Sequence, residues 1–196
     1  LDVEFREYWG GIFAAHPWLD GPSDTYLGYW KKGGGACGEH SHAINLWQTF
    51  ANISGLGRII EVSANMEYVK DGIVDYDSIC LLQFRTEKGI IGRVVQDVIT
   101  RPTRKWARAQ CSDGYLEWYC ENKPGTDTVI SCLNDGKEST IEISKTRPDD
   151  FFQEMQHINT VLKSSNNQNS PISLERGLAT MLVIAGAHMS EKNSCS

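Results

Sequence analysis

Apolar side chains occupy every second position from Ile60 to Tyr68, and polar side chains fill the positions between them. This period of two is typical of a strand with one buried face. A second strand is expected at residues 77–86, where the continuous apolar run from Ile79 to Leu82 indicates burial on both faces. We therefore expect this second strand to lie inside a sheet, with a neighbouring strand on each side.

The chain beyond residue 86 continues as short apolar segments separated by turns that contain glycine. Turns of this kind join neighbouring antiparallel strands. The pattern therefore predicts a meander of antiparallel hairpins. The expected strands lie at residues 90–100, 104–111, 115–119, 128–133 and 139–144.

A period of 3.6 residues predicts helices before and after this run of strands. The first helix extends from about Cys37 to Ile53, and its stripe places His42, Leu46 and Phe50 on one face. The architecture we expect is an open, mainly antiparallel sheet with helices packed on one face, which belongs to the α+β class. The stripes of two closing helices comprise Phe151, Met155, Ile158 and Leu162 in one and Leu174, Leu178, Leu182 and Ala185 in the other.

Size and charge narrow the classes of function. The 196 residues suit one domain, or one domain with a small appendage, and 40% of them are hydrophobic. A net charge of −6 argues against a broad nucleic-acid-binding surface. No apolar run approaches the length of a membrane span and no signal peptide opens the chain, so we expect a cytoplasmic protein without membrane contact. Because the first residue is Leu1 rather than Met, we also expect a fragment or a processed product.

The six cysteines form no C-x-x-C pair. They lie mostly in apolar, strand-like segments, which favours reduced thiols in a cytoplasmic protein. Disulfide bonds are the alternative. The cysteines are Cys37, Cys80, Cys111, Cys120, Cys132 and Cys195.

Residues 33–45 carry the clearest chemical signal. Three glycines lead into Glu39 and His42, which stand three positions apart. On a helix, residues at this spacing share a face. A carboxylate beside an imidazole can transfer protons near neutral pH, so Glu39 and His42 are the candidate catalytic pair. The structural alternatives are a core histidine and an acid that stabilises a helix N-terminus.

The same segment matches the letters of the dinucleotide-binding fingerprint, because Gly33, Gly35 and Gly38 satisfy G-x-G-x-x-G. The preceding residues 26–32 are aromatic and basic, which is unlike a buried strand. Glu39 would also place a negative charge where a pyrophosphate needs a positive potential. No alternation of strands and helices follows, as a doubly wound domain requires. A dinucleotide site is therefore the minor alternative.

Two histidines beside Glu39 and Cys37 raise the question of a metal site. On a helix of 3.6 residues per turn, His40 and His42 point about 200° apart, so both rings cannot bind one ion. No second group of ligands with zinc spacing occurs in the sequence. We therefore expect no metal, and we expect His40 to face solvent or a loop.

Two further groups of residues suggest a binding site. Residues 1–32 are rich in aromatic residues, glycine and proline without a clean period, and such loops often line a concave site, with Tyr26 among the candidates. Basic residues gather at Arg101, Arg104, Lys105 and Arg108. These basic residues indicate either a solvated strand face or a pocket for an anionic substrate.

Taken with later segments, residues 33–45 make the chain recognisable. It resembles the C-terminal domain of the Gfo/Idh/MocA oxidoreductases, named after glucose-fructose oxidoreductase, inositol dehydrogenase and rhizopine catabolism proteins. The resemblance covers nearly the whole chain, and the order of the blocks is more specific than any one block. The other blocks are residues 74–77, 86–89, 112–118 and 151–157.

In this family, a Rossmann domain that binds NAD(P) precedes a sheet domain that completes the sugar site. The resemblance implies that residues 1–196 form a C-terminal substrate-binding and oligomerisation domain, with the Rossmann domain absent from the chain. NAD or NADP would act in the full-length enzyme, and no cofactor is expected for this chain alone. The implied small-molecule partner is a sugar or sugar derivative.

The resemblance also implies roles for single residues. His42 matches the family's acid/base at the sugar hydroxyl, and Glu39 matches its acid. The E-x-x-H spacing departs from the common D-x-x-x-H and resembles a subgroup linked to bacterial surface polysaccharides. In that subgroup, comparable positions to His16, Asp97, Arg101 and Arg104 lie near the substrate, so these four residues are implied substrate contacts.

An open sheet face suggests association with further copies of the chain, because large apolar patches usually mark interfaces. The alternative to an enzyme domain is a stand-alone, non-catalytic module that dimerises or binds a carbohydrate. The sequence lacks G-x-S-x-G, so it gives little support to a hydrolase. The candidates for the open face are Val94, Val98, Trp106 and Trp118.

Overall fold

The structure is a computed structural model that describes residues 1–146, 148–164 and 170–194. Cys195 lies outside the described residues. The other five cysteines are free thiols, in agreement with the expected reduced state. The chain divides into two compact units, Leu1–Arg108 with Thr180–Ser196 and Ala109–Ala179.

Eight strands and five α-helices make up the described chain. The strands are β1 (Asp2–Arg6), β2 (Ile59–Asp71), β3 (Val74–Thr86), β4 (Ile91–Asp97), β5 (Arg104–Cys111), β6 (Gly114–Lys123), β7 (Thr126–Leu133) and β8 (Glu138–Ser144). The α-helices are α1 (Trp9–Ala14), α2 (Gly35–Glu39), α3 (His42–Ile53), α4 (Asp149–Lys163) and α5 (Leu174–Ser194), and three short 3₁₀ helices are η1 (Pro22–Asp24), η2 (Tyr26–Gly28) and η3 (Trp30–Lys32).

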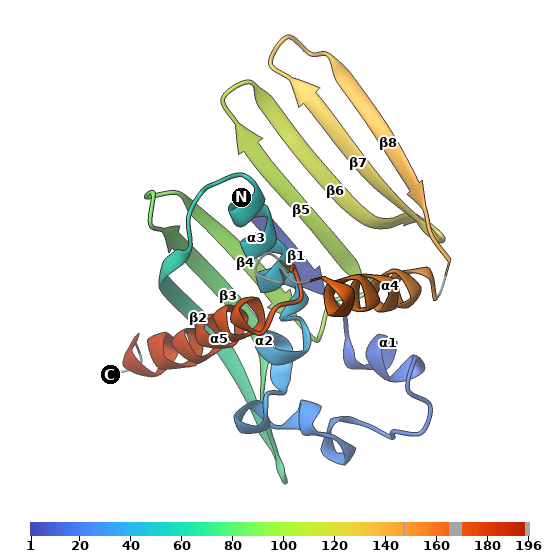
Figure 1. The fold of residues 1–196 in the computed structure, drawn as a ribbon. Coiled ribbons are helices and arrows are strands. Elements are labelled where there is room, and N and C mark those ends of the chain that lie inside the picture. The colour runs from blue at the N-terminus through green and yellow to red at the C-terminus, as the bar shows by residue number, and fades with distance from the viewer. Residues whose placement is uncertain (147, 165–169, 195–196) are drawn as a thin grey trace. The chain divides into compact units, whose positions relative to one another are not determined.

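The strands form an open, mixed sheet that is mostly antiparallel, in the order β2-β3-β4-β1-β5-β6-β7-β8. Helices accompany the sheet (Figure 1), which confirms the expected α+β class. β3 has a partner on each side, as its apolar run predicted. Neighbouring strands pair antiparallel from β2 to β4 and again from β6 to β8, as expected for hairpins.

The five-residue strand β1 corrects the predicted meander. It runs parallel to β4, with Val3 beside Val94, and antiparallel to β5, with Val3 beside Ala107. β4 and β5 are therefore not a hairpin, although they follow each other in the chain. The first residues of the chain thus belong to the interior of the sheet rather than to a covering loop.

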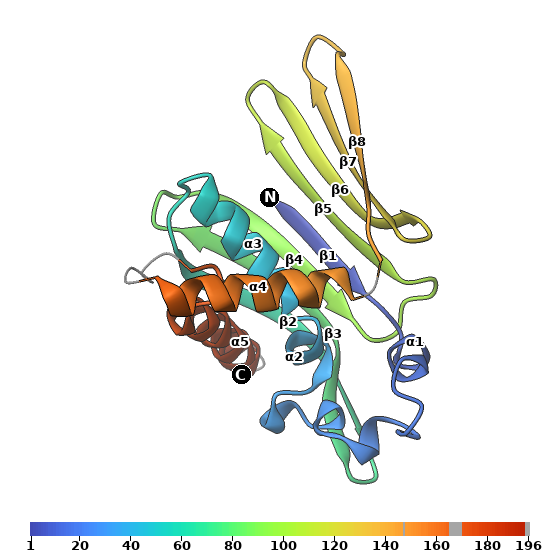
Figure 2. The ribbon, with the colours of Figure 1, turned by 45° about the vertical axis from the view of Figure 1, so that its right-hand side comes forward.

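Helix α3 contacts β1 and β4 (Figure 2). The indole Nε1 of Trp47 donates a hydrogen bond to the carbonyl of Leu1 at 3.0 Å. Gly92 makes room for this ring, because a Cβ there would lie 2.6 Å from Nε1. Val94 stands two residues further along β4, so it shares this face and is 0% exposed. The expectation that Val94 lies on the open face is therefore wrong.

The single helix expected at about residues 37–53 is also wrong. α2 ends at Glu39, and α3 begins only at His42. The side chain of Gln96, buried on β4, donates a hydrogen bond to the carbonyl of His40. The same carbonyl also accepts the backbone N–H of Ala43 at 2.9 Å, three residues along, in place of the i to i+4 bond of a continuous α-helix. The break lies at the position that joins the two candidate catalytic residues.

The core face of α3 differs from the expected stripe of His42, Leu46 and Phe50. His42 is exposed, and the other two side chains are only partly buried. The ring of Trp47 packs edge-on against Phe84, with centroids 5.2 Å apart. The residues that α3 buries are Ala43, Ile44, Trp47 and Ala51.

Helix α5 covers the free edge of β2. The backbone N–H of Ala64 donates to the hydroxyl of Ser190 at 3.1 Å, and that of Met66 donates to the carboxylate of Glu191 at 2.9 Å. An edge strand otherwise presents unpaired backbone groups that invite other strands to pair. The two side chains thus satisfy the edge without extending the sheet.

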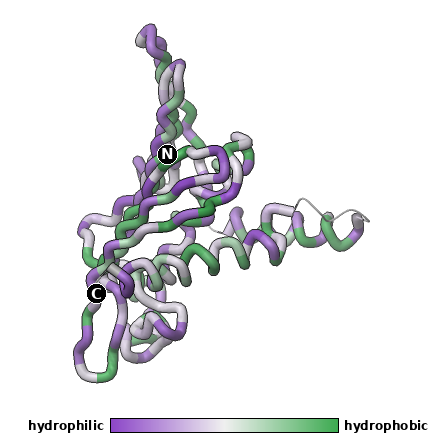
Figure 3. The backbone as a smooth tube through the Cα atoms, turned by 90° about the vertical axis from the view of Figure 1, so that its left-hand side faces the viewer, coloured by the Kyte–Doolittle hydropathy of each residue, from purple (hydrophilic) through white to green (hydrophobic). Residues whose placement is uncertain are grey.

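The two closing helices occur where they were expected, but the stripes differ. Hydrophobic and hydrophilic stretches alternate along them in Figure 3. The expected stripe residues Phe151, Met155 and Leu162 of α4 are exposed. In α5, Leu174, Leu178 and Leu182 are exposed, whereas the buried apolar residues are Val183, Ile184 and Ala187.

Helix α2 is held to β3 by a buried carboxylate. Asp77 is 0% exposed, and its Oδ2 accepts a hydrogen bond from the backbone N–H of Cys37 at 2.7 Å. The residue before α2 is Gly34, which has no side chain to cap the helix. Gly35 has a φ of +79°, and a Cβ there would lie 1.9 Å from Oδ1 of Asp77. Only glycine therefore allows the carboxylate to approach this closely.

We expect Gly35→Ala to lower the free energy of unfolding by roughly 2–5 kcal/mol, because backbone strain and a steric clash add. Gly89→Ala is the matched control, since Gly89 has a φ of +77° with no atom near its missing Cβ. Denaturant unfolding of both variants separates the backbone strain, which both share, from the clash with Asp77, which only Gly35→Ala creates. Equal losses in the two variants would show that the contact with Asp77 is not tight.

The pH dependence of stability is a second test of this contact. Burial raises the pKa of Asp77 to about 7, partly offset by backbone hydrogen bonds from Cys37 and its neighbours. The folded state therefore favours the protonated acid, and this stabilisation is present below about pH 4 and is lost as the pH rises through about 7. At 1.36 kcal/mol per pKa unit, the loss amounts to roughly 4 kcal/mol at most.

We therefore expect wild-type stability, relative to that of Asp77→Asn, to fall between pH 4 and pH 8. Asparagine keeps the shape of the side chain but does not titrate. The control is Asp71→Asn, because Asp71 is exposed at the end of β2. A stability difference between wild type and Asp77→Asn that stays constant over this range would contradict the expectation.

Candidate functional site

Glu39, the last residue of α2, lies among charged and titratable groups from several segments. Burial raises its pKa, and the charges of His42, His16 and Lys105 lower it less, while Glu7 raises it further. The pKa of Tyr26 is raised by burial and by the charge of Glu39. These groups therefore lie within range of the charge of Glu39. We call them the acid–histidine cluster, which comprises Glu7, His16, Tyr26, Glu39, His42 and Lys105.

An ion pair joins the two members of the cluster that come from the sheet. Glu7 directly follows β1, and Lys105 lies on β5. Nζ of Lys105 is 3.1 Å from the carboxylate of Glu7, and it lies over the ring of Phe5. Sequence analysis noted Lys105 only as one of several basic residues and missed Glu7, because β1 was not recognised as a strand.

The loop after α1 brings His16 to the cluster. Its Nδ1 is 2.8 Å from the carbonyl of Ile12, and its ring meets that of Trp18 edge-on at 5.3 Å. The side chain of Tyr26, at the start of η2, is exposed. The structure thus brings His16 and Tyr26 to the side of the predicted pair.

His42 and Glu39 reach the same cluster even though no single helix connects them. The exposed imidazole of His42 stands at the start of α3, and the partly buried carboxylate of Glu39 ends α2. A carboxylate with a raised pKa holds its proton more readily, and a neighbouring imidazole can exchange it. This pair can therefore transfer protons to and from a ligand that approaches from solvent.

His40 is 3% exposed, so of the two expected surroundings it contacts a loop and not solvent: its ring is hydrogen-bonded to the backbone of Glu7, which follows β1. Burial and the charge of Lys105 lower its pKa to about 4, against smaller opposing effects of Glu7 and Asp97. The ring is therefore neutral near pH 7. Among the described residues, Nε2 of His40 has no hydrogen-bond partner. Helical periodicity does not tell whether the histidine at position 40 is buried or exposed, because the helix is broken here.

The structure places Asp97 in a structural network. Its carboxylate accepts hydrogen bonds from Arg6, from the backbone of Ile99 and from the backbone and hydroxyl of Thr100. Burial raises its pKa, but these hydrogen bonds outweigh burial and hold it below the usual value. This carboxylate is 0% exposed and anchors the segment after β4.

Arg101 and Arg104 also have partners outside the cluster. The guanidinium of Arg101 lies 3.8 Å from the ring centroid of Tyr8. Nε of Arg104 is 3.0 Å from the carboxylate of Glu4, and its guanidinium lies 5.3 Å from the ring of Trp106. Of the sequence-predicted site residues, His16, Tyr26, Glu39 and His42 therefore come together, and the other three do not join them.

The glycines at residues 33–38 serve packing. A Cβ at Gly34 would lie 2.3 Å from the carbonyl of Tyr26, and one at Gly38 would lie 2.0 Å from the carbonyl of Gly33. The carboxylate of Asp77 already occupies the N-terminus of α2. A pyrophosphate would meet backbone and the carboxyl group of Asp77 at this place, so the segment does not fit a dinucleotide.

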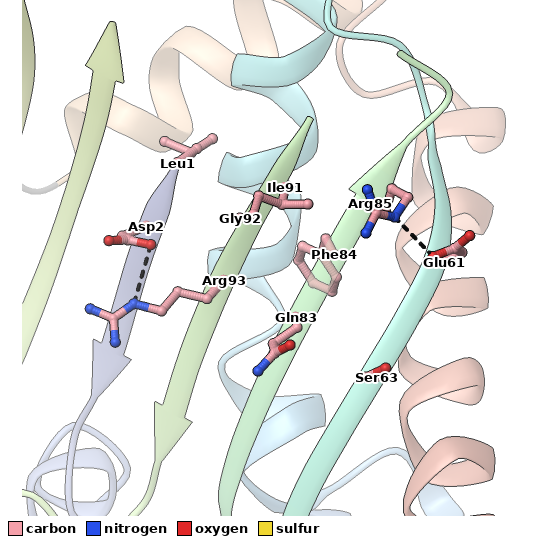
Figure 4. Close-up of a pocket in the computed structure, with 10 residues that line it drawn as sticks. All are labelled: Leu1, Asp2, Glu61, Ser63, Gln83, Phe84, Arg85, Ile91, Gly92 and Arg93. Carbon is pink, nitrogen blue, oxygen red and sulfur yellow. Dashed lines mark hydrogen bonds and ion pairs between the residues drawn. The ribbon is translucent and has the colours of Figure 1, made fainter. Parts of the chain in front are cut away.

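The described surface carries a shallow cavity of about 430 Å³ elsewhere, shown in Figure 4. Its residues come from β1 to β4, and ion pairs of 3.1 Å join Arg85 to Glu61 and Arg93 to Asp2. None of the sequence-predicted site residues lines it. Its charged groups neutralise each other, so the acid–histidine cluster is the better candidate for chemistry.

The described residues contain no group of three or more histidine, cysteine, aspartate or glutamate side chains placed to hold a metal ion. None of the helices in the described part of the chain has the length and apolar content of a membrane span.

No family model matches the sequence, and no curated protein is significantly similar to it. Solved structures do match the fold, and the chain spans about half of their length. Levoglucosan dehydrogenase in complex with NADH matches 98% of this chain and 56% of its own, at 13% identity and a TM-score of 0.73. An NAD-binding oxidoreductase from Klebsiella pneumoniae matches 97% and 55%, at 15% identity and a TM-score of 0.71.

A third solved structure holds both a cofactor and a sugar nucleotide. It is the WlbA dehydrogenase from Bordetella pertussis in complex with NADH and UDP-GlcNAcA, which matches 98% of this chain and 52% of its own. The identity is 14% and the TM-score is 0.60. At identities this low, the comparison shows only that this chain has the fold of one half of each of these oxidoreductases.

We expect the 196-residue chain to show no micromolar binding of NADH or NADPH in isothermal titration calorimetry. The described residues offer no free helix N-terminus at the glycine-rich segment, as a pyrophosphate site requires. A thermal melt of the same sample controls for folding. Micromolar binding by the folded chain would make residues 33–38 a dinucleotide site after all.

Proposed function

We propose that this chain is the substrate-binding domain of an NAD(P)-dependent oxidoreductase that acts on a sugar or a sugar derivative. The observation that carries the proposal is the acid–histidine cluster, in which Glu39 and His42 lie together beside His16 and Tyr26. The fold supports it, because nearly the whole chain matches one half of several oxidoreductases, levoglucosan dehydrogenase among them. The resemblance of residues 33–45 to the Gfo/Idh/MocA family points the same way.

In the proposed reaction, His42 accepts the proton of the sugar hydroxyl while the carbon beneath it loses hydride. Its exposed position at the start of α3 gives a ligand direct access. An imidazole is suited to this step because it titrates near neutral pH. In the reverse direction the same ring returns the proton to the carbonyl oxygen.

Glu39 supports His42 in this proposal. A carboxylate close to the ring favours the imidazolium that forms when the proton is taken up. The raised pKa of Glu39 also makes it a proton acceptor for the next transfer, away from the sugar. His16 and Tyr26 flank the pair as substrate contacts through hydrogen bonds to sugar hydroxyls.

Asp97, Arg101 and Arg104 have a supporting part in the proposed site. Asp97 fixes the segment after β4, and Arg104 is paired with Glu4. We assign Asp97 and Arg104 the positioning of β1 and β5, the two strands that bring Glu7 and Lys105 to the cluster, and Arg101 the positioning of Tyr8.

The cofactor of the proposed enzyme supplies the hydride chemistry. Since residues 33–38 do not fit a dinucleotide, we place NAD or NADP on a Rossmann domain outside these 196 residues. The full 1–196 segment is then the C-terminal substrate domain of a longer, cytoplasmic enzyme. A role in surface-polysaccharide metabolism follows from the subgroup that the E-x-x-H spacing resembles.

We also propose that copies of the chain associate through the open face of the sheet. Leu81 on β3 is exposed, although it lies in the middle of a central strand. Leu81 replaces Val94, Val98 and Trp106 as a candidate, because these three side chains are buried.

The sharpest test of the proposed function is His42→Asn in the full-length enzyme. We expect kcat to fall by roughly 10²–10⁴-fold, the usual contribution of a positioned acid/base. Stability should stay within about 0.5 kcal/mol, because His42 is exposed. Steady-state kinetics with NAD⁺ or NADP⁺ and a panel of sugars, alongside a thermal melt, measures both.

His157→Asn is the matched control for this experiment. His157 lies on α4 outside the cluster, with Nε2 2.9 Å from the hydroxyl of Ser170. We expect this variant to keep kcat within threefold or so of wild type, since it removes no member of the acid–histidine cluster. Normal kcat in His42→Asn would remove His42 from the proton path.

A further inference from the structure

Two neighbouring residues of β5 carry positive charges to opposite faces of the sheet. Lys105 pairs in register with Phe5, on the face that α3 covers, so Arg104 points to the other face. Each has its own carboxylate from the segment around β1. Glu7 lies 3.1 Å from Lys105, and Glu4 lies 3.0 Å from Arg104. The two ion pairs are alike, but only the pair of Lys105 belongs to the acid–histidine cluster.

The charges of the cluster do not suit an anion. Among the described residues that shift the pKa of Glu39, Lys105 is the permanent cation, and Glu7 neutralises it. Glu39 adds a second carboxylate, whose negative charge burial already disfavours. Whether Glu39 is ionised or protonated, no permanent positive charge is left unpaired in the cluster.

The free-energy cost of desolvation then decides which ligand groups can bind in the acid–histidine cluster. A carboxylate or phosphate that leaves water needs a cation or several donors at its destination. A hydroxyl is neutral and can donate to Glu7 or Glu39 while it accepts from Lys105. The cluster therefore matches the alternating donors and acceptors of a polyol.

We infer that the cluster binds an uncharged polyol ring and disfavours a ring that carries a carboxylate, with the Glu7–Lys105 ion pair setting this selectivity. This rests on the proposed function, because it names the substrate class of the same site. It concerns the ring that reaches His42 and leaves open which groups are attached further away. Arg104 and Lys105 are thus each neutralised and do not form a pocket for an anionic ring.

Binding of matched sugars to the full-length enzyme tests this inference. The probes are UDP-glucose and UDP-galactose, each compared with its 6-carboxylate, UDP-glucuronate or UDP-galacturonate, by isothermal titration calorimetry. We expect wild type to bind at least one neutral sugar more tightly than its uronate, by roughly tenfold or more. Each pair differs only at C6, so the nucleotide contributes equally to both affinities.

Two charge-neutralising variants locate the selectivity. Glu7→Gln leaves Lys105 unpaired beside the cluster, and we expect the affinity ratio to move toward the uronate by roughly tenfold to a hundredfold. Glu4→Gln leaves Arg104 unpaired on the opposite face and should not change the ratio. The double variant Glu7→Gln with Lys105→Gln should return the ratio to that of wild type.

The outcomes separate the inference from the proposed function. Equal shifts in Glu7→Gln and Glu4→Gln, or no shift in either, would overturn the role of the ion pair. Tighter wild-type binding of the uronates would overturn the substrate class, and this measurement holds even where Glu7→Gln does not fold in a thermal melt. If wild type binds none of the four sugars, the proposed function fails and the inference fails with it.

Discussion

One buried hydrogen bond, from the backbone N–H of Cys37 to the carboxylate of Asp77, holds the candidate site on the sheet. α2 has only five residues, and Gly34 before it offers no side chain as a cap. Asp77 on β3 supplies the missing acceptor, and Gly35 adopts the left-handed conformation that lets it approach. Because α2 ends at Glu39 and α3 begins three residues later, the place of both candidate catalytic residues depends on this contact.

The second half of the site depends on β1. This strand lies between β4 and β5, so the residue that follows it, Glu7, comes beside Lys105. The same arrangement pairs Glu4 with Arg104 and Arg6 with Asp97. Arg104 and Lys105, neighbours in the sequence, are thus separated in space by the alternation of β5, and each is neutralised by its own carboxylate. The local charge at the cluster is set by these pairs, and the net charge of the chain says little about it.

Much of the fold could be predicted, because local patterns of apolar and polar residues indicate where most strands begin and end. β5 was expected at its observed bounds, and β2, β3 and the hairpin strands within a few residues of theirs. β1 also alternates, with Val3 and Phe5 between charged residues, but this five-residue signal was lost among the aromatic residues that follow. Its parallel pairing with β4 joins residues about 90 positions apart, which no local pattern encodes. Glu7 was missed for the same reason.

By itself, the sequence determined the types of most elements, the α+β class and the nearness of Glu39 to His42, since each follows from spacing along a few turns or strand residues. The tertiary structure decided which histidine is buried, which face of α3 joins the core and which cations are neutralised. α2 ends at Glu39 and α3 begins at His42, so the stripe expected for a continuous helix no longer applies. Burial and charge pairing arise between residues far apart in the chain, and only the folded sheet brings those residues together.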